Sequence, residues 1–107
     1  MEKQFTDENF QSEVVEASKD KPVLVDFWAA WCGPCRLQGP IVSQVSEEMA
    51  GKAIVGKLDT EQNQKIAAQF GIMSIPTLLI FKDGKVVENF IGLQPKEVLV
   101  EVLKKYI

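Results

Sequence analysis

Short apolar runs alternate with segments of helical periodicity along most of the chain, and this alternation constrains the fold more than any other feature. Residues 23–29 form a nearly continuous apolar and β-branched run, and residues 53–58 and 76–81 form two more. Such runs are typical of strands covered on both faces. The segments between them place apolar residues three or four positions apart, as an amphipathic helix does. Strand-helix-strand units predict parallel pairing through right-handed crossovers, so we expect an α/β fold.

Four helices are expected from the same pattern. The first follows Thr6 or Asp7, either of which could cap it, and the second begins at Gly33-Pro34. The third is short and ends at Gly71, and the last begins near Pro95. The expected apolar faces are Phe10, Val14 and Ala17 in the first helix; Leu37, Ile41, Val45 and Met49 in the second; Ile66, Ala67 and Phe70 in the third; and Val98, Leu99, Val102, Leu103 and Tyr106 in the last.

A tight turn in the C-terminal third adds an antiparallel hairpin. Asp83-Gly84 separates the run at 76–81 from an alternating strand at 86–91, and Asp-Gly is a strong signal for a two-residue hairpin turn. A short edge strand near Phe5 completes the expected sheet. The prediction is a central mixed five-stranded β-sheet flanked by four helices. Because the 107 residues contain no linker, repeat or low-complexity segment, we expect residues 1–107 to form a single domain.

The composition excludes several classes of site. The chain contains no histidine, so it cannot build a Ser-His-Asp triad, a Cys-His dyad or an imidazole metal site. Twelve lysine and arginine residues against fifteen aspartate and glutamate residues give a net charge of -3, which disfavours a nucleic-acid partner. No glycine-rich nucleotide fingerprint is present, so we expect no bound organic cofactor. Reactions near neutral pH must then use a carboxylate, a lysine or a thiol.

The N-terminal residues and the longest apolar stretches bear on location. Residues 1–4 lead directly into polar sequence, without the basic and then apolar run of a secretory signal. The apolar stretches at 22–31 and 75–81 are too short to cross a bilayer. We therefore expect a cytoplasmic protein without membrane association, in a compartment where thiols are normally kept reduced.

The two cysteines lie three positions apart, between an expected strand and an expected helix. Cys32 would lie at the N-terminal end of the helix, where free amides and the helix dipole stabilise a thiolate, and Cys35 would lie in its first turn. Such a pair is half of a zinc site, an inert pair or a redox couple. Its placement, with no other Cys or His to complete a metal site, favours the redox couple, in which Cys32 attacks a disulfide and Cys35 releases the product.

At this level of detail the sequence resembles the thioredoxin family over essentially its whole length. The residues that carry the resemblance are Phe27-Trp28-Ala29-Ala30-Trp31-Cys32-Gly33-Pro34-Cys35-Arg36, Pro40, Ile75-Pro76-Thr77-Leu78, Phe81-Lys82-Asp83-Gly84 and Gly92. The resemblance implies a thioredoxin fold and a general protein-disulfide reductase that cycles a Cys32-Cys35 disulfide. It also implies re-reduction by a separate thioredoxin reductase, with electrons from NADPH or ferredoxin. We expect disulfide-containing proteins as substrates, no bound metal and a monomeric protein.

The resemblance assigns roles to two charged residues in the expected strands. Asp26 is the one carboxylate in the run at 23–29, and burial should raise its pKa toward neutrality. In the family the matching Asp helps to deprotonate the second cysteine, here Cys35, and Lys57 matches the lysine beside this Asp. From position alone, a buried structural ion pair explains Asp26 and Lys57 equally well.

The resemblance also predicts an apolar rim around Cys32. Ile75-Pro76 resembles the cis-proline loop of the family, although an isolated proline before an apolar run is usually a strand start, and only ~5 % of such bonds are cis. In the family the backbone before this proline pairs with a substrate strand. Without the resemblance, such apolar residues are core or incidental surface. The expected rim is Trp31, Gly33, Pro34, Ile75, Pro76, Gly92 and Leu93.

Arg36, Gly39 and Met73 depart from the commonest family pattern, without removing a catalytic group. They bear on partner choice and redox poise rather than on the type of reaction. Three other functions remain open at this point: a disulfide oxidant or isomerase, a non-enzymatic docking module with incidental thiols, and a dimeric zinc or iron–sulfur protein.

Overall fold

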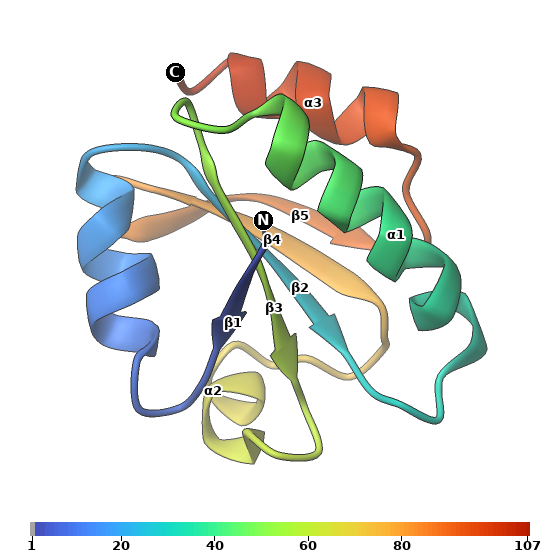
Figure 1. The fold of residues 1–107 in the computed structure, drawn as a ribbon. Coiled ribbons are helices and arrows are strands. Elements are labelled where there is room, and N and C mark those ends of the chain that lie inside the picture. Colours follow the sequence, from blue (N-terminus) through green and yellow to red (C-terminus); the bar gives the residue numbers. More distant parts are fainter. Residues whose placement is uncertain (1) are drawn as a thin grey trace.

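The computed structural model describes residues 2–107 and places five strands in one sheet, in the order β1-β3-β2-β4-β5 (Figure 1). β1, β3 and β2 are parallel, β4 pairs antiparallel with β2, and β5 pairs antiparallel with β4 at the edge of the sheet. This confirms the mixed five-stranded sheet. The strands are β1 (Lys3–Phe5), β2 (Val23–Trp28), β3 (Ile54–Asp59), β4 (Thr77–Lys82) and β5 (Lys85–Ile91).

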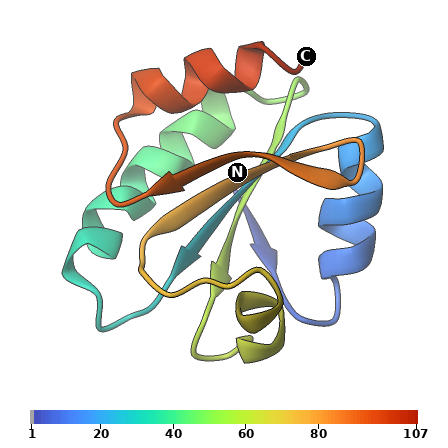
Figure 2. The ribbon, with the colours of Figure 1, turned by 180° about the vertical axis from the view of Figure 1, so that it is seen from behind.

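Helices cover both faces of the sheet, as Figures 1 and 2 show from opposite sides. α1 (Gly33–Glu48) and α3 (Lys96–Lys104) pack on one face, over a buried cluster that includes Leu24, Leu78 and Ile80. The first helical segment and α2 (Gln64–Gln69) pack on the other face, over a cluster that includes Phe27 and Leu58. The first segment consists of η1 (Gln11–Glu16), a π-helix, and η2 (Ala17–Lys19), a 3₁₀-helix.

Neither candidate cap occupies the N-cap of η1, which is Phe10 and has no side-chain cap; Thr6 instead closes the turn before the helix. The Asn9 amide donates to Thr6 Oγ1 at 3.1 Å, and the Thr6 amide donates to Asn9 Oδ1 at 2.8 Å. Asp7 instead accepts from the amides of Ile66 at 2.9 Å and Lys65 at 3.3 Å, at the start of α2. A carboxylate bonded to free amides at a helix N-terminus stabilises that helix. Asp7 is therefore a cap, but for a helix 56 or more residues away along the chain.

Two expected helix faces are partly wrong. Leu37 is 63% exposed, and Gln38, at 0%, is buried in its place, in line with Val45 and Met49. At 100° per residue, Leu37 lies about 120° around the helix axis from Met49, whereas Gln38 lies within about 20° of it. A repeat of four therefore drifts off the buried face over three turns. On α3 Val98 is exposed and Val100 is buried, in the cluster that also holds Val42 and Val45 of α1. The other expected core residues of these two helices are buried or partly buried.

The direction of the strands places the cysteines and the cis-proline loop together. Cys32 follows the carboxyl end of β2, and Ile75-Pro76 precedes the amino end of β4. Because β4 pairs antiparallel with β2, with Phe27 opposite Thr77, these two ends are adjacent. The hairpin between β4 and β5 has the expected two-residue turn, with positive φ at Asp83 and Gly84.

Candidate redox site

The two cysteines form a disulfide at the N-terminal end of α1. Cys32 is the N-cap residue with extended backbone, and Cys35 lies in the first turn, with their Cα atoms 5.3 Å apart. Pro34 occupies a first-turn position that needs no amide hydrogen. The Cys35 amide donates to Cys32 Sγ at 3.2 Å. The same amide and the positive end of the helix dipole would stabilise a thiolate on Cys32 after reduction.

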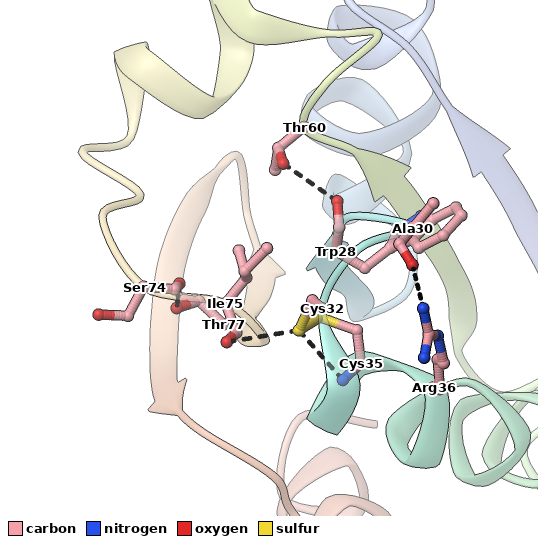
Figure 3. The surroundings of a disulfide bond; sticks show 9 residues. All are labelled: Trp28, Ala30, Cys32, Cys35, Arg36, Thr60, Ser74, Ile75 and Thr77. Atoms are coloured by element: carbon pink, nitrogen blue, oxygen red, sulfur yellow. Dashed lines mark hydrogen bonds between the residues drawn. A yellow bond between two sulfur atoms is a disulfide. The ribbon is translucent and has the colours of Figure 1, made fainter.

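The loop before β4 faces the disulfide (Figure 3). The Ile75-Pro76 peptide bond is cis, as the family resemblance predicted. The Ile75 carbonyl oxygen lies 3.8 Å from Cys32 Sγ. A sulfur in a disulfide carries no proton, so in this oxidised form the approach is a contact rather than a hydrogen bond. Thr77 Oγ1 donates to the Ser74 carbonyl oxygen at 2.6 Å and ties the loop to the start of β4.

Asp26 is fully buried beneath the disulfide, and neither carboxylate oxygen has a hydrogen-bond partner. Burial raises the pKa of Asp26 to about 7, although the positive charge of Lys57 acts in the opposite direction. Lys57 lies opposite Asp26 in the β2-β3 register. Its ammonium group pairs with Glu2, at 3.6 Å, and lies 5.5 Å from the centre of the Trp28 ring. Among residues 2–107, Asp26 has no ion-pair partner within 4 Å.

A cavity connects Asp26 with Cys35. It has a volume of about 610 Å³ and is lined by Asp26, Trp28, Cys35, Arg36, Gly39, Pro40, Ser43 and Lys57. Asp26 and Cys35 therefore line the same cavity, although the carboxylate oxygens of Asp26 have almost no solvent-accessible surface in this oxidised form. A Cβ atom at Gly39 would lie 3.8 Å from Lys57 Nζ, an ordinary contact distance, so an alanine would fit at this position. Arg36 points away from the cis-proline loop and donates to the Ala30 carbonyl oxygen at 3.2 Å (Figure 3).

The expected rim residues lie next to the cysteines in the chain, in the loop before β4 or in the loop after β5, and they are not equally accessible. Trp31 is 66% exposed, and Gly33, Pro34 and Leu93 are also exposed. Ile75 and Gly92 are half-buried. Pro76 is buried, so its side chain forms no part of an open surface. The Gly92 amide donates to the Pro76 carbonyl oxygen at 2.8 Å, which joins the two loops of the rim.

The structure also reveals residues near the site that the sequence reasoning missed. Leu37 and Ile91 are exposed apolar residues on α1 and at the end of β5, and Met73, which the sequence analysis connected with partner choice, is exposed on the loop before β4. Gln38 is buried and bonds the loop that follows β5. The sequence carried no clear signal for Gln38, because the spacing of four predicted Leu37 as the buried residue of this turn. Apolar residues in loops carry no clear signal in one sequence either.

No helix within residues 2–107 is long and apolar enough to cross a membrane. In the same part of the chain, no group of three or more His, Cys, Asp or Glu side chains is arranged to hold a metal ion.

Comparison with known proteins agrees with this geometry. The family model for thioredoxin matches residues 2–105. A thioredoxin of Alicyclobacillus acidocaldarius is 54% identical over 95 residues, which cover 89% of this chain and 88% of that protein. A thioredoxin of Chlorobaculum thiosulfatiphilum is 49% identical over 102 residues, 95% of this chain and 93% of that protein. A thioredoxin of Listeria monocytogenes is 48% identical over the full length of both chains. With this match and a Cys32-Cys35 disulfide at a helix N-terminus, the chain belongs to the thioredoxin family of thiol-disulfide oxidoreductases.

Proposed function

We propose that this oxidoreductase acts as a general protein-disulfide reductase, with Cys32 as the nucleophile. The observation that carries the proposal is the position of Cys32 at the N-cap of α1, where its sulfur accepts the Cys35 amide at 3.2 Å. The thiolate is the attacking form in disulfide exchange, and a helix N-terminus favours it. Cys35 lies one turn inside the helix and lines the cavity that reaches Asp26, so it is the residue that resolves the reaction.

The reaction proceeds through two exchanges. The Cys32 thiolate attacks one sulfur of the target disulfide, forms a mixed disulfide and expels the other sulfur as a thiolate, which takes up a proton. Cys35 then loses its proton to Asp26 and attacks the Cys32 sulfur. The Cys32-Cys35 disulfide forms, and the second target sulfur leaves as a thiolate. Two electrons pass from the dithiol to the target.

Asp26 suits the role of proton acceptor. A general base is most effective when its pKa lies near the working pH, and burial raises the pKa of Asp26 to about 7. Asp26 and Cys35 line the same cavity, which supports a proton transfer between them. In this proposal Lys57 tunes the pKa of Asp26 through its positive charge.

We propose that the rim binds an extended segment of the target. Trp31, Gly33, Pro34 and Leu93 supply exposed surface, and Ile75, Pro76 and Gly92 shape the backbone around the disulfide. Extended peptides bind by adding main-chain hydrogen bonds to exposed backbone, which explains how one site can accept many sequences.

The remaining elements of the proposal follow the family. A separate thioredoxin reductase returns electrons from NADPH or ferredoxin to the disulfide, and the protein works in the cytoplasm as a monomer of one domain, residues 1–107. It requires no bound cofactor or metal, nucleic acid or membrane.

Reduction of insulin disulfides in the presence of dithiothreitol tests the proposal. We expect the purified protein to accelerate the reaction well beyond dithiothreitol alone, and we expect Cys32→Ser to abolish the acceleration. Cys35→Ser, reduced beforehand and mixed with insulin after removal of the dithiothreitol, should instead accumulate a mixed disulfide with insulin, which mass spectrometry under non-reducing conditions detects. Turnover no faster than with dithiothreitol alone would contradict the proposal. A reduction potential near the −120 mV of the oxidant DsbA, rather than the −270 mV typical of thioredoxin, would assign the reverse direction.

A further inference from the structure

A buried glutamine on α1 joins this helix to the loop between β5 and α3. Gln38 Nε2 donates to the Gln94 carbonyl oxygen at 3.0 Å, and Gln38 Oε1 accepts from the Gln94 amide at 2.8 Å. One side-chain amide therefore satisfies both backbone groups of a residue 56 positions away. The reverse orientation of the amide would set donor against donor, so this pairing is the only consistent one. A buried side chain bonded at both ends is a specific link.

The link continues to the disulfide through the backbone. The Gly92 amide donates to the Pro76 carbonyl oxygen at 2.8 Å, and the adjoining Ile75 carbonyl oxygen lies 3.8 Å from Cys32 Sγ. In Figures 1 and 2 the loop after β5 runs beside the N-terminal half of α1. Gln38 follows Cys35 by three residues, so both lie on the same side of α1. A ring of contacts therefore leads from α1 through both rim loops and back to the sulfur of Cys32.

We propose that Gln38 is a positioning residue that holds both rim loops at the separation from Cys32 that a protein target requires. The inference rests on the proposed function, because it takes these loops to be the place where a target segment lies. Replacing the amide with an aliphatic side chain of similar size fills the same space but leaves the Gln94 backbone groups without partners. Buried backbone groups do not remain unpaired, so the loop moves until water satisfies them.

The consequence depends on the size of the substrate. An extended protein segment contacts the rim along its length, so its binding depends on where the two loops lie. A small soluble disulfide needs access to the Cys32 sulfur alone. Loss of the Gln38 link should therefore weaken the reaction with a protein disulfide and leave the reaction with a small disulfide almost unchanged.

Gln38→Met, which keeps the volume and removes both hydrogen bonds, tests the inference. We expect the KM for insulin to rise about fivefold with kcat nearly unchanged, the pattern of lost ground-state binding. The rate constant of the reduced protein with 5,5′-dithiobis(2-nitrobenzoic acid) should stay within about twofold. An equal loss on both substrates, or no loss on either, would overturn the inference.

Asn63→Leu is the matched control. Asn63 is also a buried amide that joins segments 56 positions apart, accepting from the Asp7 amide at 2.9 Å and donating to the Asp59 carbonyl oxygen at 3.1 Å. It takes no part in the ring around the disulfide. We expect Asn63→Leu to lower stability without changing the ratio of the two rates. A change in that ratio as large as that of Gln38→Met would assign the effect to general destabilisation and overturn the inference.

Amide hydrogen exchange tests the inference without any substrate. In Gln38→Met we expect the amides of Gln94 and Gly92 to exchange about tenfold faster, while amides in the centre of β4 keep their protection. Unchanged exchange at Gly92 would show that the ring is not coupled and would overturn the inference. A wild-type protein that fails to reduce insulin contradicts the proposed function instead, and leaves this measurement intact.

If Gln38→Met fails to fold, Gln38→Glu can be used to test the inference instead. It keeps an acceptor for the Gln94 amide and loses the donor to the Gln94 carbonyl oxygen. We expect its exchange rate at Gln94 to lie between those of the wild type and an unlinked loop, with a raised KM for insulin. An unchanged KM for insulin in this variant would overturn the inference.

Discussion

Two aspartates, Asp7 and Asp26, occupy opposite situations in the same small fold. The Asp7 carboxylate accepts two amides at the start of α2, and its own amide donates to Asn63 at 2.9 Å. The Asp26 carboxylate is fully buried at the disulfide end of β2 and accepts no hydrogen bond at all. The first region is a structural anchor in which both carboxylate oxygens and the amide of Asp7 have partners. The second keeps a carboxyl group that the fold leaves unsatisfied.

The difference between the two aspartates shows that the surroundings of a carboxylate decide whether it stabilises the fold or is available for proton transfer. A carboxylate with amide donors is stable in its charged form and holds segments together. A carboxylate buried without donors favours its protonated form, which is why the pKa of Asp26 is raised to about 7. Such a group lowers stability at neutral pH, and folds retain such costs mainly at functional sites. Four variants test this comparison.

Asp26→Asn should have the largest effect, on the pH dependence of stability. The folded state holds the Asp26 proton up to about pH 7, whereas the unfolded chain releases it near 3.8. The folded state therefore binds more protons between these values, and stability falls as pH rises through this window. The free energy of unfolding falls by roughly 4 kcal/mol for a pKa shift of this size.

Urea unfolding at pH 4 and pH 8 measures this fall in stability. The asparagine variant should lose this part of the pH dependence and exceed the wild type at pH 8. Equal slopes in both proteins would contradict the assignment.

The same substitution should slow the resolving step. Without its base, Cys35 must give its proton directly to water, so we expect release of the mixed disulfide to slow about ten- to a hundredfold at pH 7. Rapid-quench analysis of the mixed disulfide with insulin measures the rate. The internal control is pH: at pH 9 hydroxide is more abundant than at pH 7 and can take the Cys35 proton in place of Asp26, so the gap between variant and wild type should narrow. A gap that persists at pH 9 would point to a steric cause.

Asp7→Ala should affect stability alone. Loss of a capping side chain costs about 1–2 kcal/mol, because the Lys65 and Ile66 amides lose their acceptor. The urea midpoint should fall, while the rate of insulin reduction stays at the wild-type value. Asp20→Ala, which removes an exposed carboxylate, is the charge control and should change stability by less than about 0.5 kcal/mol. A lower rate of insulin reduction in Asp7→Ala would contradict the assignment of a purely structural role to Asp7.

Lys57→Met and Glu2→Gln should have the smallest effects, in opposite directions. Lys57 lowers the pKa of Asp26, so its removal should raise that pKa and move the pH profile of the resolving step upward. Glu2 pairs with Lys57 at 3.6 Å, and neutralising it leaves more of the lysine charge to act on Asp26, which should lower the pKa. Titration of the Asp26 carboxyl by NMR measures both. Shifts of the same sign would exclude Lys57 as the group that connects them.

Local chemistry in the sequence was enough to predict much of the fold. The Asp83-Gly84 turn, the helix beginning at Gly33-Pro34 and the apolar run around Asp26 each predicted the element that the structure contains. The spacing of Cys32 and Cys35 predicted a redox pair from the chemistry of a helix N-terminus. In each case the signal lies within a few consecutive residues, so interactions between neighbours along the chain are sufficient to predict the element.

Contacts between distant residues could not be read in this way. Asp7 looks like a cap for the next helix, and only the packing of α2 beside β1 turns it to Ile66 instead. The rotation of α1 about its axis decides that Gln38 is buried and Leu37 exposed, and a spacing of four residues does not specify that rotation. The sequence identified Asp26 as a carboxylate in an apolar run. Only the three-dimensional structure shows that neither of its oxygens has a hydrogen-bond partner.

The sequence by itself determined the order of elements, the turn types and the redox pair, because these depend on neighbouring residues and on backbone geometry. The tertiary structure alone decided which polar groups are satisfied and which are left without partners, because hydrogen bonds and burial depend on residues that are far apart along the chain. In this protein the tertiary structure gives the Asp7 carboxylate hydrogen-bond donors and leaves the Asp26 carboxylate without any. This difference makes Asp7 a structural anchor and Asp26 the proposed proton acceptor.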